Sequence, residues 1–128
     1  MTILTLNFNF SYFVDDFKVK SFYYSKNQSD IYIWFDFKER GINLSSYSIT
    51  SSSNGENSGH WRNWVIEISN DELNWEEVDR HDDYSSLNVP NKIATFEINK
   101  KLKDFVRFIR IRQTLFSWRG DFYIFFPC

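Results

Sequence analysis

The 128-residue sequence has little of the material from which helices and covalent cross-links are made. It contains one alanine, one methionine and one cysteine. The scarcity of alanine and methionine argues against a helical protein, and the lone Cys128 excludes a disulfide within the chain. The charges nearly balance, at a formal −2, so the chain has no general attraction to nucleic acid or to an anionic membrane.

The sequence also has no apolar run long enough to span a membrane. Its first ten residues lack a basic segment followed by an unbroken apolar stretch. Leu4, Leu6 and Phe8 alternate with polar residues instead, which is typical of a strand and not of a signal peptide. Together with the single cysteine, this pattern predicts an intracellular, cytoplasmic protein that does not bind membranes.

Aromatic residues are abundant, at 20% of the chain. They favour strands, and the length fits one domain, so we expect an all-β domain. Its clearest element is a hairpin that begins with Trp64. Residues 64–69 alternate as a strand, Ser69–Glu72 are turn formers, and Leu73–Val78 return as a second strand. We expect Trp64 and Trp75, one on each strand, to pack in the core.

The rest of the chain consists of short strand-like segments separated by polar turns. Their spacing of roughly 8–12 residues predicts a sandwich or a barrel with about eight antiparallel strands. The further expected strands are residues 3–13, 17–24, 31–37, 47–51, 92–98, 105–114 and 121–126.

Six short pieces of the sequence, some of them single residues, occur in the order and spacing of a known family. They are Ile33–Phe37, Tyr47–Ile49, Trp64–Glu67 with Ser69–Asp71 and Asn74–Trp75, then Asp79, Phe96, and Phe108–Ile111 with Gln113–Thr114. Over residues 31–126 the chain resembles the discoidin-type domain, also called the F5/8 type C domain. It resembles most the intracellular versions in protist proteins and in adaptors that carry a BTB domain.

The chain also departs from this family. Glu72 stands where the family commonly has glycine, residues 1–30 diverge from the family's opening, and the sequence stops at Phe126-Pro127-Cys128. We therefore expect a single domain over residues 1–128, with a trimmed or a divergent C-terminal end. It would be part of a larger multidomain protein or a stand-alone monomer.

The resemblance implies a jelly-roll β-sandwich of galactose-binding-like architecture, whose loops at one end bind glycans, phospholipid head groups or protein partners. The corresponding loops here are Ser52–Trp61, Asp79–Pro90 and Leu115–Gly120, with Ser25–Asp30 as a further candidate. They place aromatic side chains, which can stack on a sugar, beside arginines and acids that can hold polar groups. The candidate ligand-binding residues are His60, Trp61, Arg62, Asp82, Asp83, Tyr84, Trp118 and Arg119.

Other chemistry has weaker support. Arg107, Arg110 and Arg112 lie in one predicted strand, and we expect them to pair with acids of neighbouring strands or to be solvated; no nucleic-acid reading motif accompanies them. His60 and His81 lack the spacing of zinc ligands. A calcium ion held by Asp82 or Asp83 is the one cofactor left open.

The chain shows no motif that places a nucleophile beside a base, and none that positions a pair of carboxylates. We therefore expect that the protein is not an enzyme. The first hypothesis is a non-catalytic module that binds a protein partner inside the cell. The alternative is a carbohydrate-binding module, with or without calcium. A glycosidase-like enzyme is the third hypothesis and has the least support.

Overall fold

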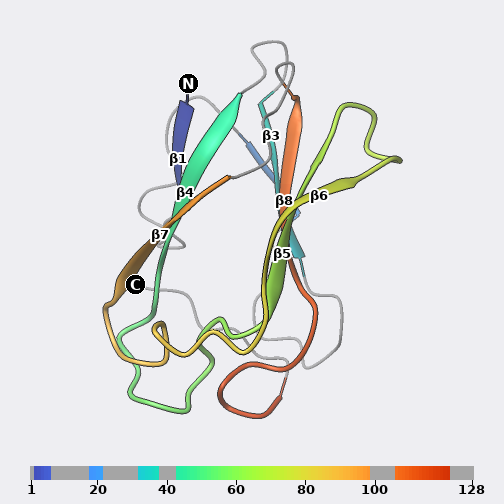
Figure 1. Ribbon diagram of the computed structural model, residues 1–128. Helices are drawn as coiled ribbons and strands as arrows, with labels where there is room; N and C mark the ends of the chain where they lie inside the picture. The colour runs from blue at the N-terminus through green and yellow to red at the C-terminus, as the bar shows by residue number, and fades with distance from the viewer. Residues whose placement is uncertain (1, 7–17, 22–31, 38–42, 99–105, 122–128) are drawn as a thin grey trace.

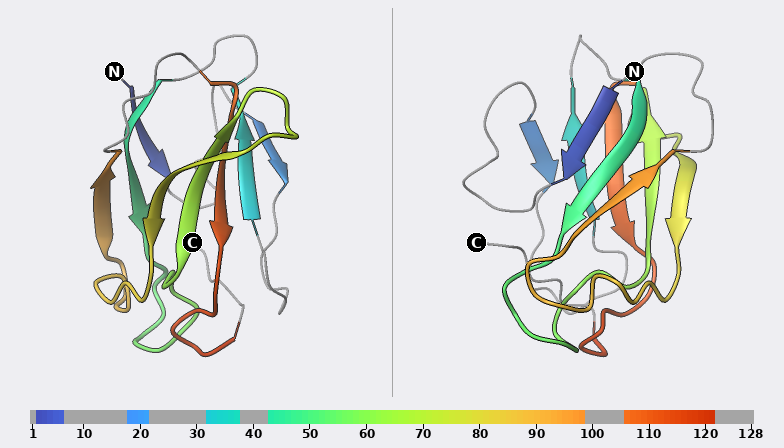
Figure 2. Two further views of the ribbon diagram at one scale, coloured as in Figure 1. Left: turned by 45° about the vertical axis from the view of Figure 1, so that its right-hand side comes forward. Right: turned by 60° about the vertical axis from the view of Figure 1, so that its left-hand side comes forward.

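A computed structural model describes residues 2–6, 18–21, 32–37, 43–98 and 106–121. Two sheets face each other, one with the strand order β1-β4-β7 and the other with the order β2-β3-β8-β5-β6 (Figures 1 and 2). Within the described ranges no helix is long and apolar enough to cross a membrane. The strands are β1 (Thr2–Leu6), β2 (Lys18–Ser21), β3 (Tyr32–Asp36), β4 (Leu44–Thr50), β5 (Trp64–Ser69), β6 (Glu76–His81), β7 (Ile93–Glu97) and β8 (Phe108–Gln113).

One strand pair departs from the expected antiparallel arrangement. β1 pairs with β4 in parallel, with Leu4 opposite Tyr47 and Leu6 opposite Ile49. Every other strand pair in the described part of the chain is antiparallel. A parallel pair requires a long crossover connection, and here the chain forms β2 and β3 of the other sheet between β1 and β4.

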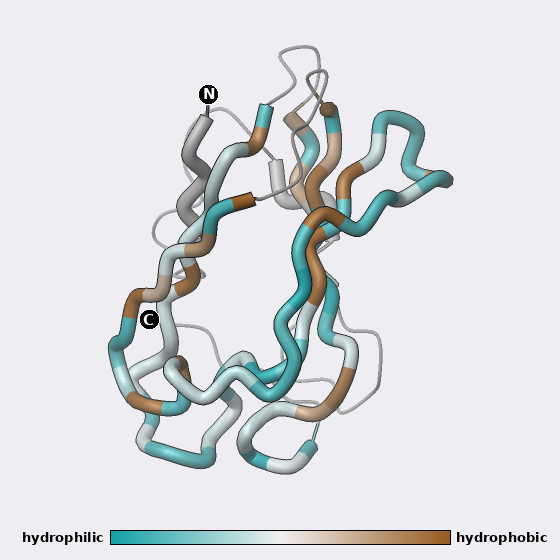
Figure 3. The backbone as a smooth tube through the Cα atoms, viewed as in Figure 1, coloured by the Kyte–Doolittle hydropathy of each residue, from teal (hydrophilic) through white to brown (hydrophobic). Residues whose placement is uncertain are grey.

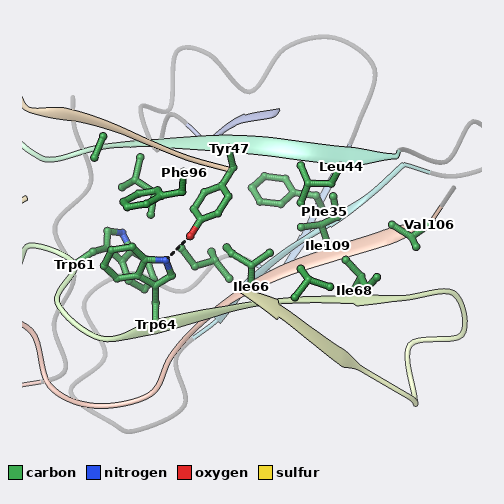
Figure 4. Packing of buried hydrophobic residues seen from close by; sticks show 14 of the residues in the cluster. Phe35, Leu44, Tyr47, Trp61, Trp64, Ile66, Ile68, Phe96, Val106 and Ile109 are labelled. Carbon is green, nitrogen blue, oxygen red and sulfur yellow. Dashed lines mark hydrogen bonds between the residues drawn. The ribbon is translucent and has the colours of Figure 1, made fainter. Parts of the chain in front are cut away.

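The core lies between the two sheets and follows the alternation of the strands. In β8, Ile109 and Ile111 point inward and lie opposite Ile68 and Ile66 of β5, and all four are buried. Apolar segments of the strands alternate with hydrophilic turns along the backbone (Figure 3). Figure 4 shows Tyr47 of β4 reaching across this core to the residues of β5. The inward faces predicted for these strands are confirmed.

The expected strand β5 is confirmed residue for residue, but the boundaries of several others differ. β4 begins at Leu44 instead of Tyr47, and β8 covers Phe108–Gln113 instead of residues 105–114. The predicted strand residues 7–13, 22–24 and 122–126 lie outside the described residues, as does the candidate loop Ser25–Asp30.

The second strand of the central hairpin begins three residues later than predicted. Asp71 accepts hydrogen bonds from the backbone N–H groups of Leu73 (2.9 Å) and Asn74 (2.7 Å), and Glu72 has a φ of 66°. These contacts hold residues 71–74 in the turn, so β6 starts at Glu76 and continues to His81. Part of the predicted polar loop from Asp79 is therefore strand.

The later start of β6 changes the position of Trp75. This side chain is only half-buried and lies outside the core cluster. Its ring packs near Phe108 and over the guanidinium of Arg110, which points away from the core. The prediction that Trp75 packs in the core is wrong, whereas Trp64 is fully buried as predicted.

Candidate ligand-binding site

Three segments that are far apart in sequence meet at one end of the sandwich. They are residues 51–63, 82–92 and 114–121, and together we call them the loop end (Figures 1 and 2). They contain all eight residues selected from the sequence. The loops predicted to form a ligand-binding surface therefore lie side by side.

Asn63 joins the three segments from a buried position. Its Oδ1 accepts a hydrogen bond from the backbone N–H of Asp83 at 2.7 Å, and its Nδ2 donates to the carbonyl oxygen of Phe116 at 2.9 Å. Its own carbonyl accepts from the N–H of Thr114 at 3.1 Å. Asn63 could not be identified from the sequence, because a single asparagine before a strand carries no pattern that reveals long-range partners.

Two further contacts join the first and second segments. The Asn57 N–H donates to Oδ1 of Asn88 at 2.7 Å, and Nδ2 of Asn88 donates to Oδ1 of Asn57 at 3.1 Å. The hydroxyl of Ser51 donates to the carbonyl of Val89 at 2.6 Å. Such contacts between segments fix the relative positions of the loops before a ligand arrives.

Arg62 is the centre of the exposed part of the loop end. Its Nε donates to Oδ1 of Asp83 at 2.7 Å, and its guanidinium carbon lies 4.1 Å from the ring centroid of Trp118 and 5.1 Å from that of Phe116. Among the described residues, its two Nη groups have no hydrogen-bond partner. A guanidinium held in this way presents its remaining donors in a fixed direction.

The aromatic side chains around Arg62 are also held in place. Trp118 donates its Nε1–H to the carbonyl of Tyr84 at 3.0 Å. Tyr84 packs edge-on against Trp64 and Phe96, with ring centroids 5.5 and 5.2 Å apart. Its backbone N–H donates to the carbonyl of Arg62 at 2.9 Å.

His60 and Trp61 are inside the molecule, with 1% and 3% of their surfaces exposed. The Nε2 of His60 lies 3.0 and 2.9 Å from the carbonyl oxygens of Asn54 and Gly55. Two carbonyl acceptors require Nε2 to carry the proton, so this ring shapes the loop from within. Trp61 packs edge-on against Trp64 in the core. Of the predicted tripeptide, Arg62 is the residue that reaches the surface.

Asp82 and Arg119 are exposed candidate residues that make ion pairs away from Arg62. Asp82 is 64% exposed and lies 3.5 Å from the guanidinium of Arg80. Arg119 is 48% exposed and forms an ion pair of 3.2 Å with Asp121. Both residues therefore form the rim of the loop end.

A chain of buried polar groups lies beneath the loop end, between the two sheets. Trp64 donates its Nε1–H to the Tyr47 hydroxyl at 3.0 Å (Figure 4). This hydroxyl donates to Oδ2 of Asp79 at 2.5 Å. The His81 Nε2 lies 3.0 Å from the same oxygen. Burial, with the bond to Asp79, raises the pKa of Tyr47. Burial alone would raise the pKa of Asp79, but hydrogen bonds from His81 and Tyr47 outweigh it and hold that pKa below its usual value.

The arginines in and beside β8 form ion pairs on the outer face of the sheet. Arg107 forms two hydrogen bonds with the buried carboxylate of Asp36, at 2.8 and 3.0 Å. Arg110 and Arg112 both contact Oε1 of Glu67, at 3.1 and 2.9 Å. The prediction that they pair with acids of neighbouring strands is confirmed.

The described residues contain no group of three or more histidine, cysteine or acidic side chains that could hold a metal ion. Asp83 faces Arg62, and Asp82 faces Arg80. A calcium ion on these acids would have to displace both arginines.

Comparison with known proteins gives one informative likeness. No protein-family model matches the chain, and no curated protein matches it. A solved structure, CBM32-1 from a family 31 glycoside hydrolase of Clostridium perfringens, is similar with a TM-score of 0.58 over 80% of this chain and 86% of that chain. The chain shares the β-sandwich fold of this structure. Because the sequence identity is 16%, the likeness shows the fold alone.

Proposed function

We propose that the chain is a non-catalytic carbohydrate-binding module and that the loop end holds the glycan. The arrangement of Arg62, Asp83 and Trp118 carries this proposal, because Arg62 of the first segment contacts one residue from each of the other two segments. The Nη donors of Arg62 and the carboxylate of Asp83 suit sugar hydroxyls, which both donate and accept hydrogen bonds. The similar solved structure is itself a carbohydrate-binding module. This likeness supports the hypothesis of a glycan ligand over that of a protein partner, which the sequence favours.

A glycan array tests this proposal. We expect selective binding by the wild type, and loss of binding in Arg62→Ala and Trp118→Ala. Glu97→Gln, at an exposed position on β7, is the matched control and retains binding. If both loop-end variants still bind the glycan, the loop end is not the binding site.

We propose further that binding requires no metal, because the acids best placed for calcium already face arginines. Addition of EDTA to the array buffer therefore leaves the signal unchanged. A signal that disappears with EDTA and returns with calcium would contradict this part of the proposal.

A protein partner is the second candidate ligand for the loop end. Val89 and Leu115 are 37% and 47% exposed there, and such side chains are commonly covered in protein interfaces. The sequence resemblance to intracellular discoidin-type domains supports the same candidate, in a cytoplasmic protein with a neighbouring domain. A well-folded wild type that binds no glycan, but retains a protein from cell lysate through Leu115, would favour it.

A further inference from the structure

The turn between β5 and β6 lies at the opposite end of the sandwich from the loop end (Figure 1). A hollow lies beside this turn. Its volume of about 360 Å³ falls within the range of small-ligand sites. Buried Ile68 and Val106 contribute apolar surface to its lining. We call it the hairpin hollow.

Trp75 supplies an aromatic wall of the hairpin hollow, and its indole is fixed. The Nε1–H donates to the carbonyl of Glu72 at 3.1 Å, and the Arg110 guanidinium lies 3.9 Å from the ring centroid. An indole that is already held loses little freedom when a ligand packs against it.

Two asparagines line the hollow with complementary hydrogen-bonding groups. Asn70 uses Oδ1 to accept from the N–H of Arg107 at 2.8 Å, so its Nδ2 donors have no partner among the described residues. Asn74 uses Nδ2 to donate to Asp71 at 2.6 Å, so its Oδ1 is the part left as an acceptor. The lining therefore offers a donor and an acceptor on separate side chains.

Two acidic residues, Asp71 and Glu76, also line the hollow, and Asp71 supplies a further acceptor. Its Oδ1 accepts from Ser69 and from the backbone of Leu73 and Asn74, whereas Oδ2 accepts, among the described residues, only from the Asn74 side chain. The hydrogen bonds from Asn74 hold the pKa of Asp71 below its usual value, so the carboxylate stays ionised. The groups that donate hydrogen bonds to Asp71 disperse its negative charge, and Oδ2 can still accept a hydrogen bond from a hydroxyl.

The contact between Trp75 and Arg110 favours a neutral ligand over a cation at this ring. The π system of Trp75 already contacts the Arg110 guanidinium, and a second cation beside this ring would be repelled by the first. An uncharged CH surface meets no such repulsion. Hydroxyl groups match a lining of separate donors and acceptors.

We propose that the hairpin hollow is a second ligand site, which takes a neutral sugar unit. The hydroxyls of the sugar bond Asn70, Asn74 and Asp71, and its apolar CH groups pack against Trp75. This site shares no residue with the loop end, so it does not rest on the function proposed above.

Nuclear magnetic resonance of ¹⁵N-labelled protein tests the proposal, with the methyl glycosides of glucose, galactose, mannose and N-acetylglucosamine as probes. We expect at least one probe to shift the side-chain amide signals of Asn70 and Asn74 and the indole signal of Trp75 in a saturable manner. Asn74→Ala weakens this binding by about fivefold or more, the effect of one lost hydrogen bond. Trp75→Ala abolishes it. Leu73→Ala, beside the hollow but not in its lining, is the matched control and binds as the wild type does.

Circular dichroism establishes whether each variant is folded. If Trp75→Ala is unfolded, Asn74→Ala alone tests the proposal. No shift at the hairpin hollow with any of the four glycosides overturns the proposal. Shifts there with butylammonium or guanidinium chloride, and none with a glycoside, also overturn it and indicate a cation site. Shifts confined to the loop end overturn the second site and leave the proposed function standing. Shifts confined to the hollow support the second site and count against the proposed function.

Discussion

Trp64 and Trp75 belong to the same hairpin but have opposite surroundings. Trp64 is fully buried between the sheets, hydrogen-bonded to Tyr47 and packed against other aromatic rings. Trp75 is half-buried on the outer face, over the guanidinium of Arg110. The difference arises because Trp64 is part of β5, whereas Trp75 precedes the first residue of β6. The alternation of strand faces predicts the direction of a side chain only within a strand.

The largest effect in this comparison is expected for Trp64→Ala. Removal of a fully buried indole leaves a cavity between the sheets, and we expect the free energy of unfolding to fall by about 3–5 kcal/mol. Urea denaturation measures this change. A loss below about 1 kcal/mol would show that the side chain is not in the core.

Tyr47→Phe tests the polar chain that holds Trp64 in the core. It retains the ring but leaves the Trp64 N–H and the Asp79 carboxylate without their shared hydroxyl. We expect a loss of about 1–3 kcal/mol, the range for a buried polar group left unsatisfied. Unchanged denaturation would mean that the hydroxyl contributes nothing to stability.

Trp75→Ala is expected to have a smaller effect than Trp64→Ala, although the two substitutions are chemically identical. The outer indole loses partial burial and one contact with a cation, together about 1–2 kcal/mol. The same urea experiment compares the two variants directly. Equal losses would contradict the assignment of the two side chains to opposite faces.

The pH dependence of stability sharpens the comparison at the inner face. The pKa of Asp79 is lower in the folded protein than in the unfolded chain, so the unfolded state binds the proton more readily. Its contribution is present above the unfolded pKa and is lost as the pH falls through the folded pKa. Thermal melts over a series of acidic pH values should therefore decline less steeply for Asp79→Asn than for the wild type or Glu97→Gln. Parallel declines would contradict the linkage.

Leu73→Ala is expected to have the smallest effect. Leu73 is 84% exposed at the tip of the hairpin, so its removal should change the free energy of unfolding by no more than about 0.5 kcal/mol. Calorimetry detects a larger change. Such a change would show that the tip packs against another part of the chain.

Features decided by local pattern could be predicted from the sequence. The residues of β5 and the inward faces of β5 and β8 were predictable, because the period of the apolar residues is sufficient to define them. The pairing of Arg107, Arg110 and Arg112 with acids was also predictable, since charges on adjacent strands of a covered sheet need partners.

Features decided by contacts between distant segments could not be predicted. The parallel pairing of β1 with β4 depends on the path of the chain through the other sheet. The burial of His60 and Trp61 depends on loops that fold over them, and the role of Asn63 depends on partners 20 and 53 residues away. The sequence predicted which loops carry the candidate residues, but not which of these residues reach the surface.

The most direct measurement of ligand binding at the loop end is a ¹⁵N spectrum of the tryptophan indoles, recorded with a glycan selected from the array. The Trp118 indole N–H donates to Tyr84 beside Arg62, and the Trp64 indole is buried and serves as the internal reference. We predict a saturable shift of the Trp118 signal, with no shift of Trp64 and none of Trp118 in the Arg62→Ala variant. A folded protein that binds the glycan while the Trp118 signal stays fixed would contradict the assignment of the site to the loop end.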